Sequence, residues 1–148
     1  KYNFIKYNMF LNTYDFLINE KHVLEINYQQ KINIHTIDQL NEELNEIIIK
    51  NNINKNGLIF LLDLSKVKSG DVNLNTAKKL IDSLQTNFPD FLHKCIVFNY
   101  TKTMKFLFNI IKSFMDKKTS SKIIINEQVN TRVKKLLYEQ KFNNLSNN

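Results

Sequence analysis

The hydrophobic residues of this chain follow two patterns, short continuous runs and helix-like spacings. The continuous runs are residues 58–63 (LIFLLD), 95–99 (CIVFN) and 122–126 (KIIIN). Runs of this length are too short for buried helices and are typical of central strands covered on both faces. A fourth segment, residues 22–28 (HVLEINY), alternates apolar and polar positions as a half-buried strand does. The pattern therefore predicts four strands.

Apolar residues at helical spacing predict helices before, between and after these strands. The expected helices are residues 1–20, 36–50, 73–88, 103–115 and 127–140. Thr36 and Gln39 have the spacing of a capping box, and Pro89 ends the third helix. Strands joined by helices indicate one α/β domain, with a mixed, mostly parallel sheet and flanking helices.

The segment TMKFLFNIIKSFM (residues 103–115) is more apolar than a surface helix needs to be. At about 100° per residue, its hydrophobic side chains form two adjacent stripes that together span about 200°. A helix packed on one face needs little more than about 100°. One stripe is Phe106, Ile110 and Phe114, and the other is Met104, Leu107, Phe108, Ile111 and Met115. The second stripe needs a further partner, such as a ligand, a membrane, another helix or a second copy of the chain.

Charge and cysteine content narrow the class of protein. The formal net charge of +7 favours anionic partners such as phospholipid surfaces or nucleic acid. Almost all basic residues are lysines, whereas base readout and bidentate phosphate binding favour arginine, so we expect no nucleic-acid partner. One cysteine suits a reducing compartment, and no apolar run reaches the ~20 residues of a membrane span. We expect a soluble cytoplasmic protein, at most peripheral to membranes.

The constellations of common enzymes are absent from the sequence. His22, His35 and His93 are scattered, without the spacing of a metal site. Cys95 opens a buried strand, where a cysteine is usually a small core residue. Two glycines could not build a phosphate-binding loop. Asp63 follows a strand at its carboxyl end and could bind a ligand or cap the next loop. We therefore expect no enzyme, no metal and no catalytic residue.

Five short motifs occur in a fixed order along residues 57–126: LIFLLD, FPDF, FNYT, KSFM and TSSKI. Their order and spacing resemble a CRAL-TRIO domain, the lipid-exchange fold of phosphatidylinositol/phosphatidylcholine transfer proteins and of retinal- and tocopherol-binding proteins. The resemblance covers about residues 36–140 of a single domain that spans residues 1–148. Residues 1–35, expected to hold a helix and the first strand, match weakly, and residues 141–148 form a polar tail.

The resemblance implies non-enzymatic binding of a phospholipid or other hydrophobic ligand, with transfer between membranes. Residues 103–115 would be a gate helix over a hydrophobic pocket, and its eight apolar residues (Met104, Phe106, Leu107, Phe108, Ile110, Ile111, Phe114 and Met115) would line the pocket or meet the bilayer. A bound lipid would take the place of a cofactor. In phosphatidylinositol-binding members, the headgroup-contacting Glu and Lys correspond to Asp90 and Lys122. A lysine can compensate a phosphate charge, and a carboxylate can accept hydrogen bonds from inositol hydroxyls.

Several departures from the family pattern leave the lipid's identity open. The sequence FPDF lacks the arginine of the family turn, and FNYT lacks the proline that precedes the gate. Residues 1–35 are too short for the family's full N-terminal helical lobe. Lysines flank the gate segment at positions 102, 105, 112, 117 and 118, which suits transient contact with an anionic membrane surface.

Two other functions remain open from the sequence. The first is a CRAL-TRIO-like interaction module for a small GTPase or other regulatory protein, with a pocket closed by Phe106, Phe108 and Phe114. The second is a STAS-like regulator, because GLIFLLDLSKVKSGD also resembles the central strand and loop of that fold. That likeness ends soon after Asp71.

Overall fold

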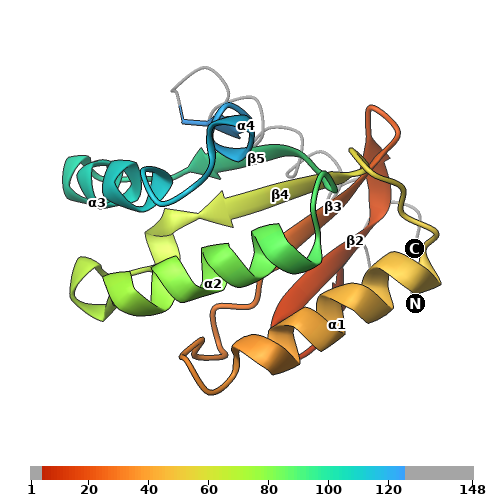
Figure 1. Ribbon diagram of the computed structural model, residues 1–148, viewed down its shortest axis with the longest axis horizontal. Helices are drawn as coiled ribbons and strands as arrows, with labels where there is room; N and C mark the ends of the chain where they lie inside the picture. Colours follow the sequence, from red (N-terminus) through yellow and green to blue (C-terminus); the bar gives the residue numbers. More distant parts are fainter. Residues whose placement is uncertain (1–4, 126–148) are drawn as a thin grey trace, which may run out of the picture.

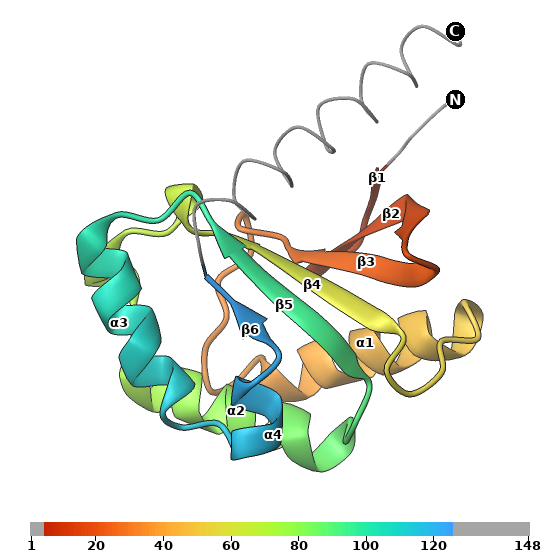
Figure 2. The ribbon, with the colours of Figure 1, turned by 90° about the horizontal axis from the view of Figure 1, so that it is seen from above.

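Six strands form one sheet in the order β1-β2-β3-β4-β5-β6, and helices join the strands of its parallel half (Figures 1 and 2). The structure is a computed structural model and describes residues 5–125. The elements are β1 (Ile5–Tyr7), β2 (Leu11–Ile18), β3 (Lys21–Ile26), α1 (Ile37–Lys50), β4 (Leu58–Asp63), α2 (Leu74–Asn87), β5 (Leu92–Phe98), α3 (Lys102–Lys112), α4 (Lys117–Ser120) and β6 (Ile123–Ile124). Strands β1 to β3 are antiparallel and β3 to β6 are parallel. The predicted α/β fold with a mixed sheet is confirmed.

Each parallel strand is followed by a helix and then by its neighbour in the sheet. Right-handed crossovers in one direction place successive helices on the same face, and Figure 2 shows α1, α2 and α3 on one side of the sheet. Helix α1 packs against this face through Leu40, Leu44 and Ile47. Helix α3 packs further along it, where Met104 and Phe108 join a separate cluster with side chains of β5 and β6. The core on this face therefore has two centres, one under each of these helices.

The helix predicted over residues 1–20 is wrong. The described part of this segment forms strands β1 and β2, and β2 continues into β3 through a two-residue loop. Both loop residues, Asn19 (φ 49°) and Glu20 (φ 66°), are left-handed, as a type I′ hairpin turn requires. Tyr14, Phe16 and Ile18 alternate toward one cluster. Aromatic and β-branched side chains at this period favour a strand, although some of the same residues also matched a helical spacing.

The other helices agree with prediction except in details at their ends. Thr36 is the residue before α1, but its hydroxyl bonds the backbone of Asn33 instead of capping the helix, so the predicted capping box is wrong. Asn73 caps α2 by accepting from the Thr76 N–H at 3.0 Å. Helix α3 ends at Lys112, so Phe114 and Met115 lie beyond it in successive turns.

The last predicted elements are only partly covered by the structure. Strand β6 includes only Ile123 and Ile124, two residues of the predicted strand 122–126. The predicted helix 127–140 and the polar tail lie outside the described residues. Within residues 5–125, every helix is too short or too polar to cross a membrane.

Candidate functional site

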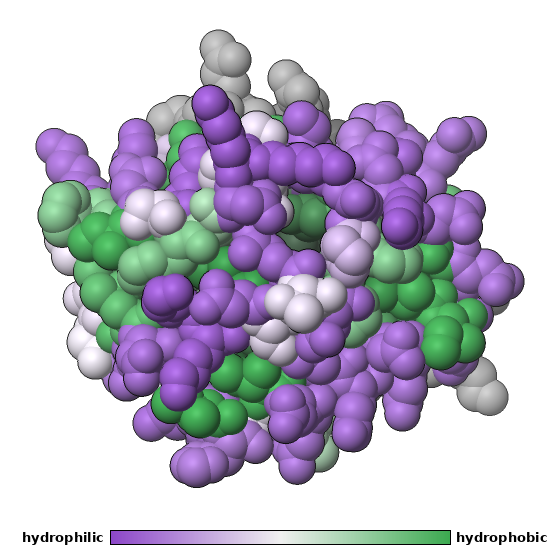
Figure 3. Space-filling model, viewed as in Figure 1, coloured by the Kyte–Doolittle hydropathy of each residue, from purple (hydrophilic) through white to green (hydrophobic). Residues whose placement is uncertain are grey.

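A cavity of about 750 Å³ lies between the sheet and the helices on its covered face. In Figure 3 the surface is hollowed near the middle of the view, and hydrophobic atoms are visible inside the hollow. The lining comes from every layer of the structure and is mostly apolar. It includes Leu24 and Ile26 of β3, Phe60 and Leu62 of β4, Cys95 of β5, Leu80, Ile81 and Leu84 of α2, and Met104, Phe108 and Ile111 of α3.

Helix α2 borders this cavity with an apolar face that is only partly buried. None of its fourteen residues is buried, whereas α1, a helix of the same length, buries five. Leu80 and Leu84 of α2 pack partly against the cluster under α1, and together with Ile81 they also line the cavity. An amphipathic helix normally buries its apolar stripe against the core. The missing contacts of α2 can be supplied by an apolar ligand in the cavity.

Helix α3 and the turns after it divide their apolar residues between the cavity and solvent. Met104, Phe108, Ile111 and Met115 line the cavity, and Leu107 packs beside the buried cluster of α3. Ile110 and Phe114 are half-buried. Phe106 is 67% exposed. The structure therefore places one stripe of the expected gate helix inward and Phe106, the first residue of the other stripe, outward.

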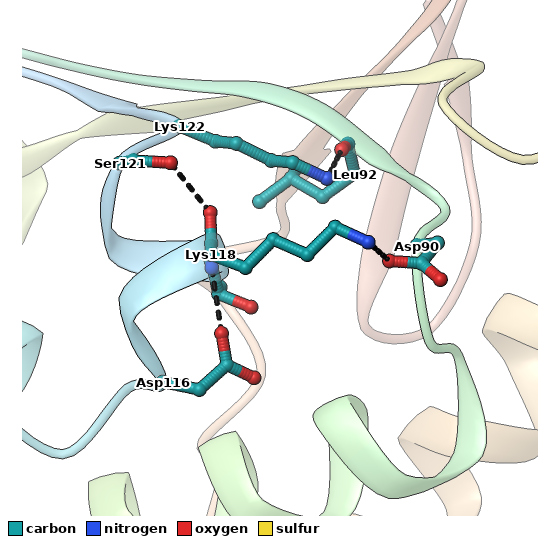
Figure 4. Close-up of polar contacts among 7 residues, drawn as sticks. Asp90, Leu92, Asp116, Lys118, Ser121 and Lys122 are labelled. Atoms are coloured by element: carbon teal, nitrogen blue, oxygen red, sulfur yellow. Dashed lines mark hydrogen bonds and ion pairs between the residues drawn. The ribbon is translucent and has the colours of Figure 1, made fainter.

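The two expected headgroup residues, Asp90 and Lys122, both line one end of the cavity. Figure 4 shows the Lys122 side chain reaching β5, where its Nζ donates to the Leu92 carbonyl oxygen at 2.7 Å. Asp90 lies in the turn before β5 with a left-handed φ of 66°. Its carboxylate does not pair with Lys122, because Lys118 of α4 forms an ion pair with it at 2.5 Å. The ion pair holds the pKa of Asp90 below its ordinary value and raises that of Lys118.

The opposite end of the cavity carries a hydrogen-bonded tyrosine. The Tyr28 hydroxyl oxygen accepts from the backbone N–H of Asp63, the last residue of β4, at 2.7 Å. Burial, followed by the nearby charge of Glu25, raises the pKa of Tyr28, so its phenol stays protonated. The Asp63 carboxylate accepts from Ser65 and Asn99. Asp63 therefore caps the loop after β4, one of the two roles expected for it.

The surroundings of Cys95 and His93 disfavour the charged form of each side chain. Cys95 lines the cavity, and burial raises the pKa of its thiol to about 12, so almost no nucleophilic thiolate is present at neutral pH. His93 lies with Nδ1 3.2 Å from the Asn56 Oδ1. Its pKa is lowered by desolvation and then by nearby lysines. Among residues 5–125, no three His, Cys, Asp or Glu side chains gather into a metal-binding group.

Sequence reasoning missed two of the polar residues at this site. Lys118 was expected only as a membrane-facing lysine, and Tyr28 was not singled out at all. Lys118 meets Asp90, a residue 28 positions earlier, only because α4 and the turn before β5 meet at the cavity. No local spacing in the sequence signals that contact.

Comparisons with known proteins identify the family. The family model for the CRAL/TRIO domain matches residues 9–143. Among solved structures, the chain is similar to one described as the crystal structure of Sfh5, with 16% sequence identity and a TM-score of 0.49. That likeness covers 71% of this chain and 42% of the solved chain, so this chain spans less than half of that protein's length. The comparison with curated proteins found no match. Because the family model covers most of the sequence, the chain belongs to the CRAL/TRIO domain family, a family of lipid-binding domains.

Proposed function

We propose that this domain holds a phospholipid, or another hydrophobic ligand, in the cavity and carries it between membranes without catalysis. The observation that supports this proposal is the only partly buried apolar face of α2 along a cavity of about 750 Å³. This volume falls within the range of about 300–1,000 Å³ that is common for small-molecule sites. Burying an acyl chain is worth about 0.8 kcal/mol per CH₂ group. Such a cavity can therefore bind a lipid through its chains alone.

The polar end of the cavity supports a position for the lipid headgroup. Lys122 donates a hydrogen bond to the neutral Leu92 carbonyl, and a phosphate oxygen would be a stronger, charged acceptor for the same ammonium group. Asp90 lies at the same end and could accept hydrogen bonds from headgroup hydroxyls. Phosphatidylinositol has both a phosphate and hydroxyls, and it is the ligand that this pair of residues suits best.

The outward side of α3 supports transient docking on the cytosolic face of an anionic membrane. Phe106 projects from the helix with 67% of its surface exposed. Lys102 and Lys105 are exposed on the same helix, and Lys117 is exposed on α4. Each lysine near an anionic surface contributes up to about 1 kcal/mol. The helix can thus present one apolar residue and several cations to the lipid headgroups.

The alternative of an interaction module with a closed pocket requires aromatic side chains to fill the cavity. Phe108 does line it, but Phe106 is turned to solvent and Phe114 is not among the lining residues. The cavity keeps a volume of about 750 Å³ with these side chains in place. This observation favours a bound ligand over a filled pocket.

Native mass spectrometry of the purified protein tests the proposal. We expect a population whose mass exceeds that of the chain by one lipid, and the excess should disappear when the protein is denatured. Liposomes that contain phosphatidylinositol and phosphatidylcholine should reload protein from which lipid has been stripped. A ligand-free protein that also extracts no lipid from these liposomes would show that the proposal is wrong.

A further inference from the structure

Two lysines tie the α4–β6 segment to the start of β5 across the polar end of the cavity. Lys118 of α4 pairs with Asp90, and Lys122, just before β6, donates to the Leu92 carbonyl. Figure 4 shows both side chains extending from the α4 side toward the turn and the strand. Asp90, Leu92, Lys118 and Lys122 all line the cavity. These two contacts therefore bridge the rim of the cavity at this end.

The two contacts differ in how easily they can be broken. The Lys118 and Asp90 side chains are 69% and 44% exposed, and ion pairs with this exposure are weak. The Lys122 contact is partly buried and uses a neutral acceptor. A phosphate group that reaches the rim carries negative charge, so it competes with Asp90 for Lys118 and repels the freed carboxylate. The outer contact is thus the one that an incoming phosphate can exchange.

We propose that the Asp90–Lys118 ion pair is a strap across this end of the cavity, and that the phosphate of an amphiphilic ligand opens it by replacing Asp90 as the partner of Lys118. This inference rests on the proposed function and adds Lys118 as a phosphate-binding residue. Asp90 has opposite effects in the two states. It closes the empty cavity, and its charge opposes binding of a ligand whose only charged group is a phosphate.

The nearby charges are consistent with such an exchange. Asp116 also lies at this end, but its carboxylate accepts from the Thr119 backbone N–H at 2.7 Å and is held within α4. Lys122 and Lys55 act on Asp90 more weakly than Lys118 does. When the phosphate arrives, the charges of Lys118 and Lys122 both become available to it.

Cys95 provides a probe of the strap that needs no lipid. It is the only cysteine of the chain, it is 6% exposed, it lines the same cavity as the strap, and its backbone N–H donates to the Lys122 carbonyl at 3.0 Å. The test compares the rate at which the Cys95 thiol reacts with N-ethylmaleimide in four proteins: the wild type, Asp90→Asn, Lys118→Met and the double variant. Asparagine tolerates the left-handed backbone at position 90. Lys117→Met is the matched control, because Lys117 is exposed on α4 and does not line the cavity.

Each single variant should raise the reaction rate about two- to fivefold, as expected for loss of an exposed ion pair. The double variant should react no faster than either single variant, and Lys117→Met should react at the wild-type rate. Urea denaturation gives the free energy of unfolding of each variant. An unchanged free energy of unfolding means that a faster thiol reaction comes from opening of the cavity and not from global unfolding. Wild-type rates in both single variants would overturn the strap, whether or not the protein binds lipid.

Binding of two amphiphiles that share one acyl chain tests the phosphate exchange. The probes are oleoyl lysophosphatidic acid and monooleoylglycerol, which lacks the phosphate. Lys118→Met should weaken binding of the first about two- to fivefold, and Asp90→Asn should strengthen it by a similar factor. Binding of monooleoylglycerol should change by less than about twofold, the lower limit of that effect. Weaker binding of lysophosphatidic acid by Asp90→Asn would overturn the exchange. A wild type that binds neither amphiphile would overturn both the proposed function and the exchange, while the thiol rates would still decide the strap.

Discussion

At the scale of single residues, the site depends on lysines whose partners differ in charge. Lys122 donates to a neutral carbonyl, and Lys118 pairs with a carboxylate. A ligand phosphate, if one binds there as proposed, would give Lys122 a charged partner without displacing a charge. Lys122 is the residue whose replacement should depend most on the charge of the headgroup.

Replacing Lys122 with Glu should weaken binding of phosphatidylinositol phosphates more than binding of phosphatidylcholine. The new carboxylate repels the extra phosphate, whereas phosphatidylcholine carries a compensating positive charge; a difference of about 1 kcal/mol or more is expected. Competitive extraction from mixed liposomes measures it, with Lys117→Glu as a control for net charge. Equal losses for both lipids would mean that Lys122 does not contact the headgroup.

The buried thiol of Cys95 should make the free energy of unfolding depend on pH. In the folded state its thiol keeps its proton up to about pH 12, whereas in the unfolded state it loses the proton near pH 9.0. Above pH 9.0 the unfolded state binds fewer protons, so the free energy of unfolding falls as the pH rises. The stability difference between wild type and Cys95→Ala should be constant below about pH 8. It should then shrink by up to about 1.4 kcal/mol per pH unit above about pH 9.

Urea denaturation of both proteins between about pH 7 and 10.5 spans the range over which an ordinary thiol titrates. Because the two proteins share every other titrating group, the difference isolates the thiol. A difference that stays flat to the highest pH would contradict the buried position of Cys95.

At the scale of elements, one glutamate of α1 hydrogen-bonds the turn between β1 and β2. The Glu43 carboxylate accepts from the backbone N–H groups of Met9, Phe10 and Leu11 at 2.8, 2.9 and 2.6 Å. These three donors belong to the turn between β1 and β2 and to the first residue of β2. A single side chain on α1 therefore accepts hydrogen bonds from all three of these backbone N–H groups.

Replacing Glu43 with Ala should lower the free energy of unfolding by about 1–3 kcal/mol, because partly buried N–H donors lose their acceptor. Glu42→Ala, an exposed neighbour on the same helix, is the matched control and should cost less than about 0.5 kcal/mol. Urea denaturation monitored by circular dichroism measures both. Equal effects would mean that Glu43 contributes no more than an exposed residue.

Helix α3 gives a second test at this scale. Phe106→Asp should reduce cosedimentation with anionic vesicles several-fold, because it removes an exposed apolar contact worth about 1.5–3 kcal/mol when fully buried. Thermal stability should change little, since the side chain is exposed. Ile49→Asp is the matched control, because Ile49 is equally exposed, at 67%, on α1. Similar losses from both variants would argue against docking through α3.

The accuracy of the sequence predictions also differed between elements. Strands β4 and β5 were recognised because Leu58 to Leu62 and Cys95 to Phe98 form continuous apolar runs. The hairpin of β2 and β3 was missed because its turn, Asn19–Glu20, lacks the glycine that usually signals a type I′ loop. The hydrophobic pocket was expected only from the family resemblance. Whether it is open could not be predicted, since its volume depends on how far α2 and α3 stand from the sheet.

At the scale of the whole molecule, the cavity separates the two centres of the core. Leu80 and Leu84 of α2 touch the cluster under α1, while Met104 and Phe108 of α3 belong to the other cluster. Residues of both helices line the cavity between them. A ligand in this position would contact both clusters at once.

Filling the cavity should therefore oppose ligand binding without unfolding the protein. Ile81→Trp adds bulk from α2 toward the cavity and should weaken lipid binding by about 1 kcal/mol or more. The melting temperature should stay level or rise, because the indole buries apolar area. Lys79→Trp places the same side chain on the exposed side of α2 as a control. Wild-type lipid binding by the Ile81 variant would place the ligand elsewhere.

The unburied state of α2 has a consequence for how the protein folds and works. A helix whose apolar side is only partly buried by the protein gains less from tertiary packing, and local opening starts at elements of this kind. A ligand that binds only the folded form adds RT ln(1 + [L]/Kd) to the stability. If the cavity holds a lipid as proposed, loading would complete the packing of α2, and release of the ligand would loosen this helix again.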